Sequence, residues 1–165
     1  MKSRPYKTIT GRAIDLSDLT AKERAFAQEA FAKFKSEPEW GSFVGWWGPR
    51  FVKAGLKKDS KIYRVCQDLE ARLGISQGKV APPDYRDSLA DLIEAAYGSR
   101  YKFCKQTGFD PGQLSRVLNR QGDLSIQSLN EILKKVHGAL MVVPEEDIRN
   151  QAGIEDMDRL LAAVD

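Results

Sequence analysis

The sequence predicts an all-α protein with an N-terminal helical unit and a C-terminal four-helix domain, to which at most one short strand is added. Two observations support this prediction. Apolar residues recur every three or four positions over several stretches, and helix-capping or helix-breaking residues separate those stretches. With 165 residues, of which 42% are hydrophobic and 30% charged, the chain can bury one good core or two small ones.

Composition also divides the chain into segments. They are a basic N-terminal arm at residues 1–15, an N-terminal helical unit at 16–78, a four-helix domain at 84–144 and an acidic tail at 145–165. The arm is poorly patterned, which is typical of a flexible or frayed terminus. Pro82 and Pro83 make the connection between the two helical parts stiff and extended. Apolar residues at helical spacing predict a short docking helix in the tail, namely Ile154, Met157, Leu160, Leu161 and Val164.

Three helices are expected in the N-terminal unit. The first runs from about Thr20 to Ser36, because Thr20 and Glu23 form a capping box, and the last covers Ser60–Leu73. The aromatic segment Glu39–Phe51 lies between them. As a helix, this segment places four rings on one face, which are those of Trp40, Phe43, Trp47 and Phe51. We interpret these rings as buried core; the alternative is a stacking platform for bases or a pocket for a partner peptide.

The most informative stretch is Ser99–Arg120, which predicts two short helices joined by a tight turn. Gly108 ends the first helix, because a sharp turn between helices needs a left-handed residue and glycine adopts that conformation without a steric penalty. Asp110 is a good N-cap for the second helix, and Pro111 suits its first position. The inward-facing positions are expected at Phe103, Cys104, Leu114 and Val117.

This stretch resembles the helix-turn-helix of the lambda-repressor-like family, also called the xenobiotic-response-element or Cro-type family. Tyr85–Tyr97 corresponds to the helix before the motif and Ser125–Val136 to the helix after it, so the resemblance covers residues 84–144. It implies a domain that binds double-stranded DNA and whose second motif helix enters the major groove. The alternative is a core with the same packing that has lost DNA binding or serves protein contacts.

The resemblance also implies a set of DNA-binding residues, which are Arg100, Gln113, Arg116, Asn119 and Arg120. The base-reading positions of the family fall on Pro111, Gly112 and Arg116. Pro111 and Gly112 have no side-chain hydrogen-bonding groups, so we expect Gln113 and Arg116 to read bases. Arg100 matches the position at the start of the first motif helix, where a polar side chain contacts phosphate.

Charge and residue chemistry restrict the function further. The net charge is +3, with a balance of +6 over residues 1–84 and −5 over residues 144–165, and a basic body suits an anionic partner. The sequence contains no phosphate-binding glycine loop and no nucleophile turn, and His137 has no metal-ligand partner at suitable spacing. We therefore expect no enzymatic activity, no catalytic residue, no cofactor and no metal.

The expected compartment is the cytoplasm. Cys66 and Cys104 fall on apolar helix faces and are 38 positions apart in the sequence, which favours two reduced core residues over a disulfide. No apolar run approaches the roughly 18 residues that a membrane helix needs, and residues 2–8 do not form an export signal.

These inferences predict a sequence-specific, repressor-like transcriptional regulator that binds double-stranded DNA through the major groove. We expect a homodimer, with the apolar segment Ala139–Val143 pairing as an edge strand with its symmetry mate. One alternative is an antitoxin that also regulates its own gene and binds a toxin through the N-terminal unit or the acidic tail. The other is a protein-interaction adaptor without DNA binding, for which Trp40–Phe51 would be the partner surface.

Overall fold

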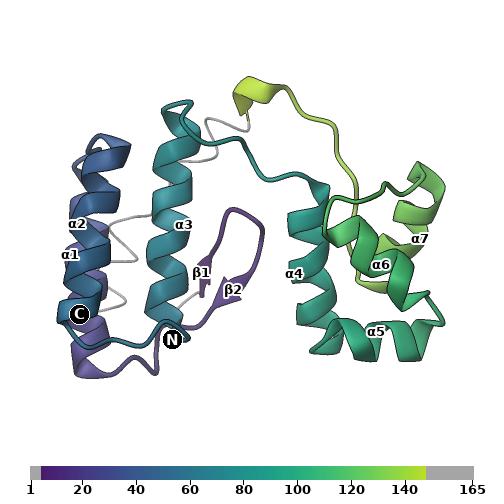
Figure 1. The fold of residues 1–165 in the computed structure, drawn as a ribbon, viewed down its shortest axis with the longest axis horizontal. Coiled ribbons are helices and arrows are strands. Elements are labelled where there is room, and N and C mark those ends of the chain that lie inside the picture. Colours follow the sequence, from purple (N-terminus) through teal and green to yellow (C-terminus); the bar gives the residue numbers. More distant parts are fainter. Residues whose placement is uncertain (1–4, 148–165) are drawn as a thin grey trace. The chain divides into compact units, whose positions relative to one another are not determined.

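The computed structural model describes residues 5–147, and Figure 1 shows its helices and strands. The chain divides into two compact units. The N-terminal unit contains residues 5–9, 13–82 and 144–147, and the C-terminal unit contains residues 10–12 and 83–143. Helices dominate both units, which confirms the predicted all-α class, and the strands of the described region are the short β1 (Tyr6–Lys7) and β2 (Ala13–Ile14).

Three helices build most of the N-terminal unit: α1 (Ala21–Lys35), α2 (Trp40–Lys53) and α3 (Lys61–Ser76). The predicted capping box is present at the start of α1, where the Thr20 hydroxyl accepts from the Glu23 N–H and the Glu23 carboxylate accepts from the Thr20 N–H. Ser60 caps α3 without a capping box, with its hydroxyl accepting from the Tyr63 N–H at 3.3 Å. Both α1 and α2 pack against α3.

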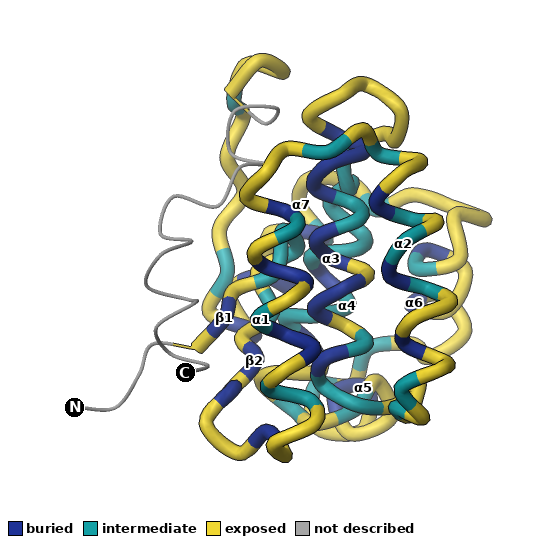
Figure 2. The backbone as a smooth tube through the Cα atoms, turned by 90° about the vertical axis from the view of Figure 1, so that its left-hand side faces the viewer, coloured by how far each residue is buried: buried dark blue, intermediate teal, exposed yellow. Residues whose placement is uncertain are grey.

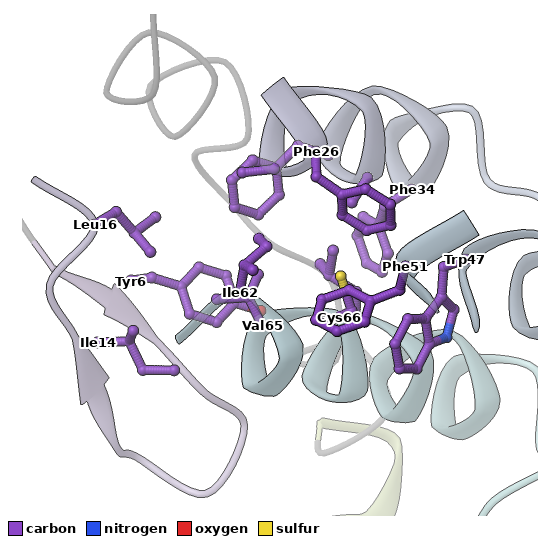
Figure 3. Close-up of a cluster of buried hydrophobic side chains, with 14 of the residues drawn as sticks. Tyr6, Ile14, Leu16, Phe26, Phe34, Trp47, Phe51, Ile62, Val65 and Cys66 are labelled. Carbon is purple, nitrogen blue, oxygen red and sulfur yellow. The ribbon is translucent and has the colours of Figure 1, made fainter. Parts of the chain in front are cut away.

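Aromatic rings fill the core of this unit (Figure 3). Phe43, Trp47 and Phe51 of α2 are buried, as predicted, whereas Trp40 is only partly buried. The ring of Phe51 meets that of Phe26 edge-on at 5.4 Å between centroids. The Trp47 indole N–H donates to the Glu70 carboxylate at 2.8 Å, so the buried ring also satisfies its polar atom. The aromatic segment is therefore a core element.

A β-hairpin occupies the place where the sequence predicted an arm. β1 and β2 pair antiparallel with Tyr6 opposite Ile14, and both of these side chains are buried. Leu16 and Leu19 after the hairpin are buried too, so the described residues 5–15 differ from the expected frayed terminus. The physical reason is long-range, because the partners that hold the hairpin lie on α3, about sixty positions later in the sequence.

A buried ionic network attaches this hairpin to α3. The Asp68 carboxylate accepts hydrogen bonds from the Tyr6 hydroxyl, from the Ile9 N–H at 2.8 Å and from the Arg72 Nε at 2.7 Å. Arg72 also donates to the Lys7 carbonyl at 2.9 Å. Burial, together with the Asp68 charge, raises the pKa of Tyr6 well above its usual value, so the phenol remains a proton donor to Asp68. The buried charges of Asp68 and Arg72 thus neutralise each other and are also hydrogen-bonded.

Removing Asp68 tests this network. Asp68→Ala leaves the Arg72 guanidinium buried without its carboxylate, and we expect it to lower the free energy of unfolding by about 3–5 kcal/mol. Urea denaturation measures the change. Asp59→Ala removes an exposed carboxylate from the loop before α3 and is the matched control, expected to change stability by less than about 0.5 kcal/mol. Equal, small losses in both variants would show that the network does not hold the hairpin.

The aromatic core makes a second prediction. Trp47→Ala creates a cavity beside Phe51 and leaves Glu70 without its donor, so we expect a loss of about 3–5 kcal/mol in the free energy of unfolding. Val52→Ala, on the exposed side of the same helix, should be close to neutral. A Trp47→Ala protein that keeps its thermal midpoint would contradict the assignment of this ring to the core.

Four helices form the C-terminal unit, as predicted: α4 (Tyr85–Tyr97), α5 (Arg100–Thr107), α6 (Pro111–Leu118) and α7 (Ile126–Lys135). Buried and exposed positions alternate along these helices with the helical repeat (Figure 2). The buried side chains that make up its core are Leu89, Ile93, Phe103, Cys104, Leu114, Leu129, Ile132, Leu133 and Val136. Ala96 of α4 lies on the solvent side of the helix and is exposed.

The segment after α7 departs from the prediction. Ala139–Val143 has no regular secondary structure, so the expected strand is absent from this chain taken alone. Most of its side chains are exposed, with Met141 78% and Val142 95% exposed, whereas Val143 is partly buried. The docking helix expected in the tail lies outside the described residues. No helix in the region from 5 to 147 has the length and apolar character needed to cross a membrane.

Candidate nucleic-acid interface

A three-residue turn joins α5 to α6. Gly108 has φ of +72°, the left-handed conformation that the sequence predicted, and its N–H donates to the Cys104 carbonyl at 2.9 Å. Phe109 follows and packs its ring 6.1 Å from that of Phe103. Asp110 then caps α6, its carboxylate accepting from the Gln113 N–H at 2.5 Å. The turn is therefore held at both ends by hydrogen bonds and in the middle by a ring contact.

The inner side of α6 is held by the core. Leu114 and Val117 are buried, and Leu114 belongs to the same cluster as Phe103 of α5. Tyr97, at the end of α4, meets Phe103 edge-on at 5.2 Å. Because α6 contacts both α4 and α5, its rotation about its own axis is set by these buried side chains. The side of α6 opposite Leu114 and Val117 therefore faces solvent.

Gln113 and Arg116 lie on that solvent side. They are three positions apart on α6, so their side chains are neighbours on the helix surface, and both residues are exposed. Asn119 is the C-cap of α6 and is also exposed, with its amide donating to the Ser115 hydroxyl at 3.3 Å. The structure thus places these three predicted residues on one short helix and its end.

Arg100 is the first residue of α5 and is exposed. Ser99 caps this helix, since its hydroxyl accepts from the Lys102 N–H at 3.2 Å. Within the part of the chain that the structure describes, neither Arg100 nor Arg116 forms an ion pair, so both guanidinium groups are available to an anionic ligand.

Arg120 differs from the other predicted residues. Its guanidinium lies 2.9 Å from Asp87 and 3.7 Å from Asp84, both at the start of α4. Two carboxylates therefore pair with Arg120 at the surface, where its side chain is 54% exposed, and it differs in this from Arg116 of α6, which is unpaired among the described residues.

Two further basic residues belong to this surface and were not predicted. Lys102 and Lys105 are exposed on α5, which contains no acidic residue, and Tyr101 beside them is 72% exposed. The sequence did contain a signal for them, namely three cations and no carboxylate within eight residues. These two positions are not among those that the resemblance to the family implies. Together with Arg116 they give α5 and α6 an unneutralised positive charge.

The described residues hold little that could support other chemistry. No group of three or more His, Cys, Asp or Glu side chains between residues 5 and 147 could hold a metal ion. Burial raises the pKa of the Cys66 thiol to about 12, and burial also raises the pKa of Cys104, so neither thiol is activated as a nucleophile. The basic surface of α5 and α6 is the most distinctive polar feature of the C-terminal unit.

Comparison with known proteins gave no significant match, whether to protein-family models, to curated proteins or to solved structures.

Proposed function

We propose that this protein is a sequence-specific double-stranded DNA-binding regulator of transcription, without enzymatic activity and without a cofactor. The observation that carries the proposal is the placement of exposed Gln113 and Arg116 on a helix whose orientation is fixed by Gly108 and Leu114. Rigid presentation of two base-reading side chains is what major-groove recognition requires.

In this proposal, the residues have distinct roles. Arg116 reads a guanine, because a guanidinium can donate two parallel hydrogen bonds to its O6 and N7, and Gln113 pairs with an adenine in the same manner. Arg100 contacts phosphate from the start of α5, assisted by Lys102 and Lys105, and these contacts set position without reading sequence. Asn119, at the end of α6, completes the contact surface.

Replacing Arg116 and replacing Arg100 should therefore change DNA binding in different ways. We expect Arg116→Ala to cost about 1–3 kcal/mol of binding free energy and to relax preference at one base pair. Arg100→Ala should weaken binding to all duplexes alike and lower the slope of log K against log salt by about one. Fluorescence anisotropy on selected and scrambled duplexes measures both effects.

Lys134→Ala is the control for these variants, because it removes an exposed charge from α7, which the proposal places outside the interface. Binding and salt dependence should be unchanged in it. Equal loss of specific and non-specific binding in Arg116→Ala would contradict its role as a base reader.

A dimer is part of the proposal, because one recognition helix seldom discriminates its site from the excess of non-specific DNA. The exposed apolar side chains of Leu140, Met141 and Val142 support it, since such a run is expected to be covered in the assembled protein. With irregular backbone in the single chain, the segment would form its strand only by pairing with a second copy.

Val142→Lys tests the dimer. A charge at this 95% exposed position should leave each unit folded but convert a dimer to a monomer in light scattering at micromolar concentration. Selection from random duplex DNA should yield an inverted repeat with half-sites about 10 base pairs apart. A monomeric unmodified protein that selects a non-palindromic site would contradict this arrangement.

The structure bears unequally on the two alternatives. An adaptor was expected to use Trp40–Phe51 as its partner surface. The rings of Phe43, Trp47 and Phe51 are buried, which leaves the partly buried rings of Trp40 and Trp46 for such a surface. The antitoxin alternative rests on the N-terminal unit or the acidic tail as a toxin-binding site, and nothing in the described residues favours it. DNA binding has the surface that supports it.

A further inference from the structure

Arg120 occupies an unusual position at the end of α6. The backbone N–H of Arg120 donates to the Val117 carbonyl at 3.0 Å, and the backbone N–H of Gln121 donates to the Arg116 carbonyl at 2.8 Å. These two bonds form a Schellman motif, in which the residue that carries the first N–H adopts the left-handed conformation. Arg120 does so, with φ of +59°.

Glycine is the residue that usually fills this position, because a side chain in the left-handed region costs about 1–2 kcal/mol. A compensating contact of the side chain can offset this cost. Glu37 and His137 are also left-handed, but of these three residues in the described region only Arg120 forms ion pairs. The left-handed turn by itself favours glycine, so the presence of an arginine at this position is explained by the ion pairs of its side chain.

The partners of Arg120 are built into the start of α4. Asp84 and Asp87 form a capping box there: Asp84 accepts from the Arg86 N–H at 2.7 Å, and Asp87 accepts from the Asp84 N–H at 3.0 Å. Burial alone would raise the pKa of Asp84, but hydrogen bonds from Arg86 and the positive charge of Arg120 outweigh it and lower that pKa. Hydrogen bonds from the backbone at the start of α4 thus hold both carboxylates in place.

A second arginine extends the cluster. Arg86 pairs with Asp84 at 2.7 Å and with Asp123, which lies in the loop that follows α6. Three carboxylates therefore meet two guanidinium groups, and the cluster keeps a negative charge. Such a site repels phosphate, in contrast to the free cations of α5 and α6.

We propose, on the basis of the DNA-binding function above, that Arg120 is a positioning residue which fastens the end of α6 to the start of α4 and makes no contact with DNA. The turn before α6 fixes the N-terminal end of this helix, and the Arg120 ion pairs fix its other end. Gln113 and Arg116 would then enter the major groove to a defined depth, as base recognition requires. This assignment separates Arg120 from the DNA-binding residues that the sequence suggested.

The experiment combines Arg120→Gly, Asp87→Asn and the double variant in the full chain. Glycine keeps the left-handed turn while deleting the side chain. Asparagine retains an oxygen that can accept from the Asp84 N–H, so the cap of α4 is preserved. Binding to the selected duplex and to a scrambled duplex is measured over a range of salt concentrations.

We expect each single variant to weaken binding to the selected duplex about tenfold, with an unchanged salt slope and unchanged binding to the scrambled duplex. The double variant should be no worse than either single one, because both remove the same contact. Arg120→Lys, which keeps the charge, should recover part of the loss. Stronger DNA binding in Asp87→Asn, or a salt slope lower by about one in Arg120→Gly, would overturn the proposal by showing that Arg120 contacts phosphate.

Thermal unfolding of the same variants without DNA separates this proposal from the proposed function. Non-additive effects of Arg120→Gly and Asp87→Asn on the unfolding midpoint support the anchor even if no duplex is bound. Additive effects would overturn the anchor, whatever the DNA measurements give. Failure of the unmodified protein to bind any duplex would instead reject the DNA-binding function.

Discussion

The left-handed turn at Gly108 is the constraint on which the C-terminal unit depends. Only three residues connect α5 to α6, and Phe103 and Leu114 on these helices must reach the same core. A residue with a side chain at φ of +72° would add strain to this connection, whereas glycine does not. Because the turn is fixed, burial of Leu114 and Val117 decides which side of α6 faces solvent, and hence where Gln113 and Arg116 lie.

Local signals explain why much of this unit could be predicted. The N-cap at Asp110 was predicted from a single residue that precedes an apolar repeat, and Asp84, Ser99 and Ser125 cap the other helices of the unit. The glycine that follows α5 was equally readable. Such features involve residues three or four positions apart, for which the backbone geometry of a helix gives the contact directly.

Long-range pairing explains what the sequence did not reveal. The hairpin is held by Asp68, 62 positions from Tyr6, and no periodicity in the first fifteen residues announces that partner. In the same way, Arg120 was grouped with Asn119 and Arg116 because they are close in the sequence, whereas its ion-pair partner Asp87 lies 33 positions away. The strand expected at Ala139–Val143 is absent from the single chain for another reason. An edge strand in a dimer takes its hydrogen bonds from a second chain.

The distribution of charge matters more than its total. A net charge of +3 on 165 residues implies little by itself, but the described cations of α5 have no carboxylate within the helix, whereas Asp84, Asp87 and Asp123 are gathered around Arg86 and Arg120. The unit therefore presents free cations beside the turn and a negative cluster at the far end of α6. In a DNA-binding protein, that contrast would select which residues approach the phosphates.

Amide chemical shifts during titration with the selected duplex test the central claim most directly, because they locate the contact surface without a mutation. The account predicts that the largest changes occur at Arg100–Lys105 and Gln113–Asn119, and that the buried residues of α3 in the N-terminal unit are unaffected. Changes confined to the N-terminal unit, or none at low salt, would contradict the assignment of α5 and α6 as a DNA-binding surface.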